Sequence, residues 1–203
     1  MRKTTVALAL AGAVLAGSLA TFGMRAPQPA AEAPLPLTTA SFSEAKWPFP
    51  IDQWGVGRAF ACATADCGAK VELYVRPKVG FCNCSTGVSD DAELERVADT
   101  ELISAQAKPL GPGRPIRIGW MDGRARAYRA GKSGLVSVAF NDECDVVVAV
   151  AATGSADPEA VAAGVLKFLD SRPMVLWAKK ELGLEYVYRE GWGAGPNASA
   201  ANN

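Results

Sequence analysis

Polar and apolar side chains alternate with period two in the first patterned part of the chain. The alternation covers residues 57–62 and again residues 71–76, and the stretch between them contains the turn formers Asp66 and Gly68. Such alternation is typical of strands that have one buried face. The pattern therefore predicts a β-hairpin whose turn lies at about residues 63–68.

A second block of alternating residues follows the helix-breaking stretch 111–113. Hydrophobic residues predict strands at residues 116–120, 124–130, 135–140 and 146–152. The dipeptide Asp122-Gly123 suits a tight turn between the first two strands, because both central residues of a type I′ turn need positive φ. These strands together predict a four-stranded antiparallel meander.

Helical spacing of hydrophobic residues appears before and after the meander. Asp90 stands at an N-cap position with Glu93 in capping-box spacing, which predicts a helix over residues 91–105. Asp157 and Pro158 open a second helix, which ends near residue 171. Shorter patterns predict a further helix over residues 174–182 and a last strand over residues 186–189.

These elements predict the α+β class, as an antiparallel sheet made of the hairpin and the meander with two or three helices packed on it. The segments 123–128, 136–140 and 146–150, with the helix end at 167–171, resemble the C-terminal half of PsbP-like and DcrB-like domains. That resemblance implies an α/β/α sandwich, often exported, which acts as an accessory or assembly protein without chemistry of its own. The cysteine-rich stretch 62–84 departs from the family.

The N-terminus has the parts of a secretory signal. Arg2 and Lys3 precede an apolar run over residues 6–19, and small residues place cleavage after Ala20, which gives a signal peptide over 1–20. We expect the rest of the chain to divide into a Pro- and Ala-rich linker, one α+β domain and a disordered tail, at residues 21–43, 44–190 and 191–203. The protein is therefore expected to be periplasmic or secreted. An uncleaved inner-membrane anchor is the alternative, because the apolar run is nearly long enough to span a bilayer.

Charge and composition exclude several functions. The 203 residues include 21 basic and 21 acidic side chains, so net charge does not favour nucleic acid as a partner. The absence of His excludes Ser-His-Asp and Cys-His activation of a nucleophile. Carboxylates such as Glu93, Glu95, Asp99 and Glu101 are interpreted as solvated helix surface. No catalytic residue is predicted.

The five cysteines are the residues that most invite a chemical interpretation: Cys62, Cys67, Cys82, Cys84 and Cys144. In an exported chain we expect them to form disulfides. Cys62 and Cys67 flank the predicted hairpin turn, so they are expected to bond to each other. The odd number leaves one thiol without a partner in the chain.

The pair Cys82 and Cys84, separated by one residue, has three interpretations. One of the two bonds to Cys144 and leaves the other as a free thiol. Alternatively the pair forms a reactive dithiol or a labile disulfide, because a ring closed through one residue is strained. In the third interpretation the pair binds Cu(I) or Zn(II) as thiolates, with carboxylates nearby because the chain has no His.

Positive charge concentrates on the predicted hairpin of the meander, at Arg117, Arg124, Arg126 and Arg129. Arginine makes paired hydrogen bonds to carboxylates and phosphates, so these residues are candidates for binding an anionic ligand or partner. The alternative is the solvated face of an antiparallel sheet. Aromatic residues near the start of the domain, Trp47, Phe49, Trp54, Phe60 and Phe81, are interpreted as core or as the wall of a binding cleft.

Two functions remain. The first is an exported, non-enzymatic accessory or binding domain, stabilised by disulfides and without a cofactor. Its partner would be another exported or membrane-associated protein, with membrane contact only through an uncleaved N-terminal segment. The second is a thiol-based redox or soft-metal-handling protein that uses Cys82 and Cys84, with Cu(I) or Zn as cofactor. The state of the cysteines distinguishes the two.

Overall fold

The protein folds around one antiparallel sheet, as seen in a computed structural model that describes residues 42–184. The strands are β1 (Ser43–Ala45), β2 (Arg58–Cys62), β3 (Val71–Lys78), β4 (Lys108–Pro109), β5 (Arg114–Ile118), β6 (Met121–Ala130), β7 (Ser133–Asp142) and β8 (Asp145–Gly154). The helices are α1 (Thr64–Cys67), α2 (Asp91–Val97), α3 (Pro158–Leu169) and α4 (Arg172–Glu181), with a 3₁₀ turn at Thr100–Leu102. The expected signal peptide, the strand at 186–189 and the tail lie outside the described residues.

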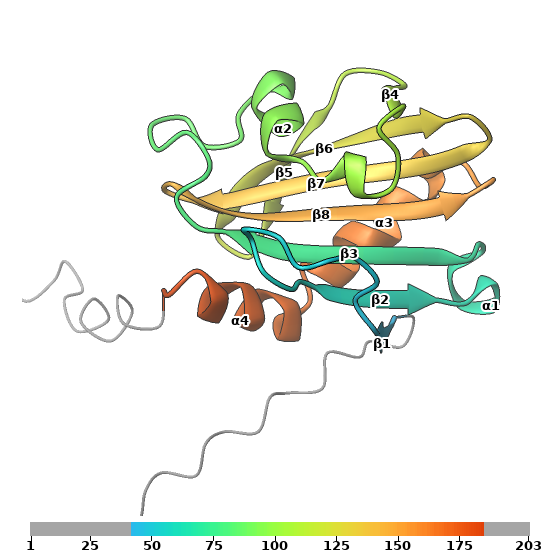
Figure 1. Ribbon diagram of the computed structural model, residues 1–203, viewed down its shortest axis with the longest axis horizontal. Helices are drawn as coiled ribbons and strands as arrows, with labels where there is room; N and C mark the ends of the chain where they lie inside the picture. The colour runs from blue at the N-terminus through green and yellow to red at the C-terminus, as the bar shows by residue number, and fades with distance from the viewer. Residues whose placement is uncertain (1–41, 185–203) are drawn as a thin grey trace, which may run out of the picture. The chain divides into compact units, whose positions relative to one another are not determined.

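The sheet confirms the α+β class and joins the predicted hairpin to the predicted meander. Its strands follow the order β1-β2-β3-β8-β7-β6-β4, and β5 also pairs with β6 (Figure 1). The hairpin β2–β3 meets the meander through β3 and β8, which pair antiparallel from Glu72 opposite Ala152 to Lys78 opposite Val146. No helix in this part of the chain is long and apolar enough to cross a membrane.

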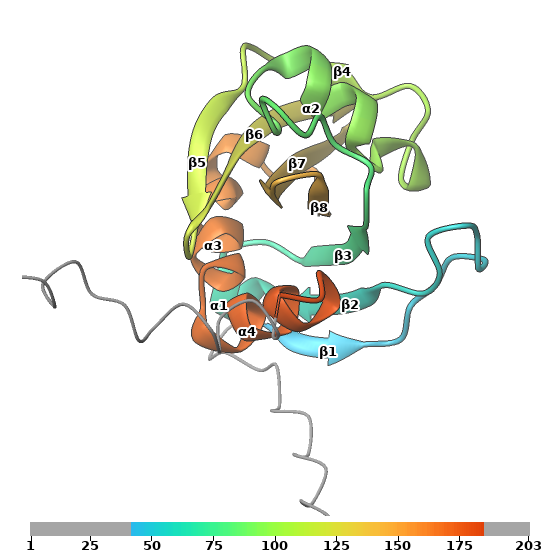
Figure 2. The same ribbon diagram turned by 90° about the vertical axis from the view of Figure 1, so that its left-hand side faces the viewer.

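The two faces of the sheet carry different layers. Val138 and Val147 belong to the larger core, which α3 and α4 cover with residues such as Phe168. Their neighbours along the strands, Ala139 and Val148, point to the opposite face and pack under α2. Figure 2 shows α2 and α3 on opposite sides of β6–β8. Alternation along the strands thus gives helices on both faces.

Two local expectations are wrong. The helix expected to reach residue 105 ends at Val97, because the chain turns there and Asp99 enters the space above the sheet. The tight turn between β5 and β6 lies at residues 119–120, where Gly119 has φ +58°. Asp122 and Gly123 instead lie within β6 and pair with residues of β5 and β7. Gly123 is needed for close packing, since a Cβ there would lie 2.2 Å from the backbone oxygen of Ala139.

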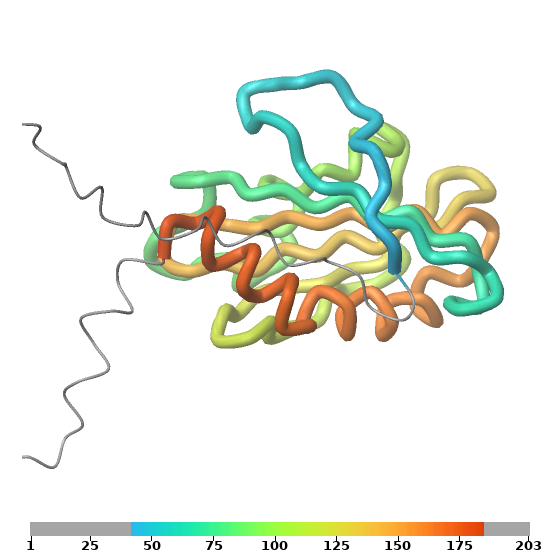
Figure 3. The backbone as a smooth tube through the Cα atoms, turned by 90° about the horizontal axis from the view of Figure 1, so that it is seen from below, coloured from blue at the N-terminus to red at the C-terminus, as the bar shows by residue number. Residues whose placement is uncertain are grey.

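The domain also begins earlier than its composition indicates. Phe42 and Ser43, assigned from the sequence to the linker, belong to the fold: Phe42 is buried and Ser43 begins β1. The Phe42 ring packs on Phe168 of α3, with centroids 4.6 Å apart. Between β1 and β2 the chain makes a wide loop that stands out from the sheet (Figure 3). This loop supplies part of the candidate site.

Candidate functional site

Two disulfides fasten the described part of the chain. Cys62 and Cys67 are bonded across α1, with Cα atoms 6.0 Å apart, as their positions at the hairpin turn led us to expect. The second bond joins Cys84 to Cys144 in the turn between β7 and β8, at an S–S distance of 2.05 Å. Such bonds form in oxidising compartments.

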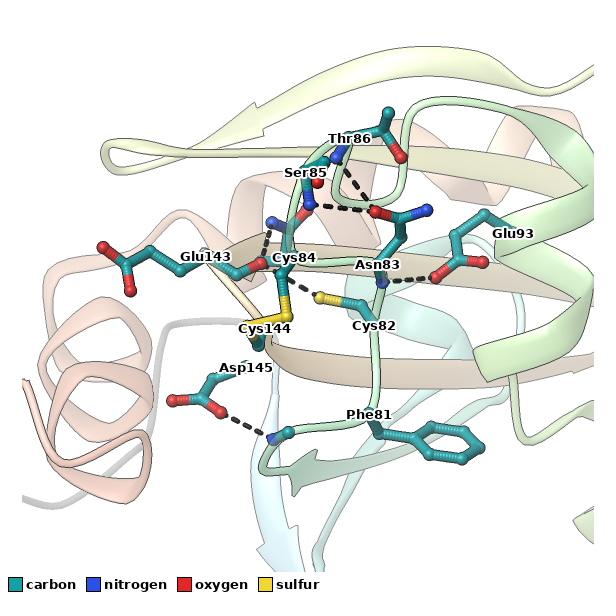
Figure 4. The surroundings of a disulfide bond; sticks show 12 residues. Phe81, Cys82, Asn83, Cys84, Ser85, Thr86, Glu93, Glu143, Cys144 and Asp145 are labelled. Carbon is teal, nitrogen blue, oxygen red and sulfur yellow. Dashed lines mark hydrogen bonds between the residues drawn. A yellow bond between two sulfur atoms is a disulfide. The ribbon is translucent and has the colours of Figure 1, made fainter.

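Cys82 is the free thiol, and it is buried. Its Sγ donates to the backbone oxygen of Glu143 at 3.2 Å, next to the disulfide (Figure 4). Burial, reinforced by the negative charge of Glu93, raises the pKa of the Cys82 thiol to about 11. Because Cys84 is bonded to Cys144, the two cysteines are not a dithiol. Within residues 42–184, no three His, Cys, Asp or Glu side chains form a group that could hold a metal ion.

We expect Cys82 to resist alkylation in the folded protein. A thiol with a pKa of about 11 is almost entirely protonated at pH 8, and reactivity requires the thiolate. Iodoacetamide at pH 8 should leave the native protein unmodified over hours and add one label per chain in denaturant, measured by intact mass. The variant Cys82→Ser is the control, which should take no label in either state. Rapid labelling of the native protein would show that the thiol is accessible.

The loop that carries Cys82 and Cys84 is attached to three other elements. The backbone N–H of Asn83 donates to Glu93 of α2 at 2.8 Å, and the N–H of Gly80 donates to Asp145 of β8 at 2.6 Å. The N–H of Val88 donates to the Asn141 side chain of β7 at 2.9 Å. These bonds and the disulfide fix the loop, so its role in the fold is structural.

Three of the four arginines proposed for anion binding have carboxylate partners among the described residues. Arg124 pairs with Asp91, and Arg126 pairs with Glu95 at 2.6 Å. A hydrogen bond from the Gly113 N–H and the contact with Arg124 lower the pKa of Asp91. These pairs tie α2 to β6. Arg117 pairs with Asp122 at 2.8 Å, and Arg129 lies opposite Lys108 in the sheet.

A different cluster of charges is buried under the loop between β1 and β2. Arg76, Lys78 and Asp99 are each at most 4% exposed. Arg76 donates to both Asp99 oxygens, from Nε at 2.5 Å and from Nη2 at 2.8 Å. Lys78 contacts the same carboxylate at 2.8 Å and donates to the backbone oxygen of Val97 at 2.7 Å. Buried charges of this kind are costly unless they are paired, so the cluster constrains the fold strongly.

Asp52 completes the cluster from the solvent side. The Nη1 of Arg76 donates to both Asp52 oxygens, at 2.8 and 2.7 Å, whereas the Asp52 side chain is 42% exposed. The hydrogen bond from Arg76 lowers the pKa of Asp52. Burial alone would lower the pKa of Arg76, but its bonds to Asp99 and Asp52 raise it overall. Both groups are therefore charged at neutral pH.

Aromatic rings surround the two cations. Trp47 lies over the Arg76 guanidinium, with 6.0 Å between the ring centroid and Cζ. The Nζ of Lys78 lies 5.7 Å from the Trp54 ring and 5.1 Å from the Phe81 ring, and these two rings contact each other at 4.6 Å. Cation–π contacts stabilise cations that have lost solvent. Trp47, Trp54 and Phe81 thus pack around the buried cations, whereas Phe60 lies in the core.

The sequence contains a signal for this cluster that is easily misread. Arg76 and Lys78 stand two residues apart on β3, so they share a face, and that face is buried between layers. Asp99 was interpreted as solvated helix surface, which is wrong, because it lies beyond the end of α2. Two cations at alternate positions of a strand inside a hydrophobic run are the available clue. The two carboxylate partners of Arg76 lie 23 and 24 residues away along the chain, and the sequence gives no sign of this pairing.

Large hydrophobic side chains are exposed beside the cluster. Of the five exposed large hydrophobic residues in the described chain, three lie at the loop and at the end of β3: Ile51, Val56 and Val79, 75%, 56% and 59% exposed. We call these three residues the apolar patch. The pairing of Asp52 with Arg76 and the stacking of Trp54 on Phe81 hold the loop against this end of β3.

A groove of about 520 Å³ lies elsewhere, between α3 and the Cys62–Cys67 turn. Its lining is mainly apolar, with Asp66 and Lys167 contributing charge of opposite sign. It contains none of the clustered charges of the loop region, so we place the candidate site at the ion cluster and the apolar patch. Comparison with protein-family models, curated proteins and solved structures yields no match for this chain.

Proposed function

We propose that the protein is an exported accessory domain without enzymatic activity, which binds another exported or membrane-associated protein through the apolar patch. The observation that carries the proposal is the exposure of Ile51, Val56 and Val79 on a frame held by an ion pair and a ring contact. Clusters of exposed apolar side chains mark protein-binding sites, and Ile51 and Val79 each adjoin a member of the ion cluster along the chain.

Further features support a binding role. The two disulfides suit an extracytoplasmic compartment, and they stiffen the turn after β2 and the loop after β3. Aromatic residues such as Trp54 and Phe81 are common at the centres of interfaces. The strands β6–β8 and the helix α3 include the segments that resemble PsbP-like and DcrB-like domains. We extend the accessory role of those domains to this protein as part of the proposal.

Site-specific photo-cross-linking tests this function. A photoreactive amino acid at Ile51 or Val79, in protein produced by its own source organism, is expected to give a cross-linked species of one defined mass. The matched control is Leu176 of α4, an aliphatic side chain that is 40% exposed and lies away from the patch. No such species is expected there, because α4 covers the opposite face of the sheet.

A second variant separates binding from folding. Val56→Glu, combined with the photoreactive residue at Ile51, is expected to reduce the cross-linked species at least fivefold and to leave the melting temperature unchanged within about 2 °C. Equal cross-linking from Leu176 and Ile51, or none from either patch position, would contradict the proposal. So would a reproducible enzymatic turnover that disappears on a single substitution.

A further inference from the structure

One carboxylate of the buried ion cluster comes from a turn on the surface. Arg76 and Lys78 carry two positive charges, and the buried partner Asp99 carries one negative charge. The remaining positive charge is balanced by Asp52, which stands on the exposed turn. The buried part of the cluster is therefore a cationic site, and a carboxylate of the chain itself occupies it.

We propose that Arg76 and the rings around it form a carboxylate-binding site, which Asp52 fills in the free protein and from which an acidic group of the partner displaces it. This inference rests on the proposed function, because the partner would reach Arg76 beside the apolar patch. The ligand class is a carboxylate flanked by apolar residues.

The positions of Arg76 and Lys78 do not depend on Asp52. Arg76 uses Nε and Nη2 for Asp99, which leaves Nη1 as the donor directed at the Asp52 carboxylate. Asp99 also holds Lys78, so the two cations keep their positions when Asp52 leaves. Arginine in this geometry binds an incoming carboxylate through charge-assisted hydrogen bonds. The site is thus preorganised for an anion.

Apart from the contacts of the Trp54 ring with Phe81 and Lys78, the turn that carries Asp52 has few attachments. Its hydrogen bonds are internal, from the Gly55 N–H to the Asp52 backbone oxygen at 3.0 Å and from the Trp54 N–H to Asp52 Oδ1 at 2.8 Å. In the part of the chain that the structure describes, Arg76 is the one hydrogen-bond partner that the turn has outside itself. Replacing Asp52 with another carboxylate keeps the charge balance, so the exchange has a small electrostatic cost.

Trp47 adds a donor to this region. Its Nε1 is buried and has no hydrogen-bond partner among the described residues, although the ring lies over Arg76. Buried donors are rarely left unpaired, and each specific case calls for an explanation. An acceptor brought into this region by a bound ligand would satisfy the Trp47 donor.

The test uses the variant Asp52→Asn, which keeps the shape of the turn and removes its charge. The probe is acetyl-Ile-Asp-Gln-Trp-amide, which copies the turn, and binding is followed by the indole N–H signals of Trp47 and Trp54 in NMR spectra. We expect D52N to bind this peptide about tenfold more tightly than the wild type, because the internal competitor is gone. A peptide with Asn in place of Asp should bind neither protein.

Two further arms identify the origin of the effect. Glu44→Gln removes a carboxylate that binds Arg58 in a similar paired geometry, at 2.9 and 2.5 Å, and should bind the peptide like the wild type. The peptide acetyl-Ile-Ala-Gln-Trp with a free C-terminus shows whether a terminal carboxylate also binds. Equal affinity of D52N for the Asp and Asn peptides, or no binding of the Asp peptide, would overturn the proposal.

Should D52N fail to fold, the wild type provides the measurement. Acetate titrated against chloride at constant ionic strength is expected to shift the Trp54 indole signal with saturation, and a non-saturating shift equal to that of chloride would overturn the proposal. A negative result here, together with cross-linking at Ile51, rejects the carboxylate site and leaves the proposed function in place. Peptide binding without cross-linking rejects the proposed function and leaves the carboxylate site in place.

Discussion

Replacing Asp99 with asparagine is expected to destabilise the fold by about 3–5 kcal/mol. The substitution leaves Arg76 and Lys78, each at most 4% exposed, facing a neutral amide inside the protein. Removing one partner of a buried ion pair is costly because the remaining charge has lost its solvent and gains nothing in return. Urea denaturation at pH 7 measures the change as a lower midpoint with an unchanged slope.

An exposed ion pair provides the control for this prediction. Asp122→Asn removes the partner of Arg117, whose side chain is 66% exposed, and should change stability by less than about 1 kcal/mol. Replacing all three buried charges, as Arg76→Met, Lys78→Met and Asp99→Leu together, is expected to restore much of the stability. A D99N variant as stable as D122N would show that water solvates the cluster.

The strands of the meander and the hairpin could be predicted because their hydrophobic pattern is local. One face of β7 and β8 packs under α3 and the other under α2. Both faces are therefore buried, and the two strands stand out in the sequence as short runs rich in valine and alanine. The short strands β1 and β4 were missed, since three and two residues show no period. The pairing of β3 with β8 could not be predicted either, because the two strands are far apart in the sequence and a local hydrophobic pattern does not show which strands pair.

The candidate site was harder to predict because its members come from distant segments. The sequence suggested arginines on β6 as an anion site, but Arg124 and Arg126 use their charges to hold α2. Arg76, a buried cation in a hydrophobic run of β3, is the one that pairs with a half-exposed carboxylate on a surface turn. What distinguishes Arg76 from Arg124 is the location of its partner on an exposed turn, and only the three-dimensional arrangement shows this.

The cysteines illustrate a prediction that the sequence narrowed without deciding. The odd count and the strain of a ring closed through one residue favoured one bond from the Cys82 and Cys84 pair and one free thiol. The structure bonds Cys84 and leaves Cys82 buried. Spacing cannot choose between two cysteines that stand one residue apart, since both lie beside the β7–β8 turn. The choice depends on which side chain points into the apolar layer under α2.

Because Cys82 and Cys84 both lie beside Cys144, we expect a large difference in stability between the variants Cys144→Ser and Cys84→Ser. The Cys84–Cys144 bond spans 60 residues, so its loss should cost roughly 4 kcal/mol, against roughly 2 kcal/mol for the five-residue span of Cys62–Cys67. Cys144→Ser is expected to show the full loss. Cys84→Ser should keep most of the stability, because Cys82 can then bond to Cys144.

The main chains that carry Cys82 and Cys144 are already close to each other. The backbone N–H of Cys82 donates to the oxygen of Cys144 at 3.0 Å, which places the two main chains as close as neighbouring strands. Neighbouring Cα atoms at that spacing fall within the range that a disulfide spans. Both variants are oxidised, unfolded in urea and alkylated: C144S should label at Cys82 and Cys84, whereas C84S should take no label. Free thiols at Cys82 and Cys144 in oxidised C84S would show that the burial of Cys82 prevents the exchange.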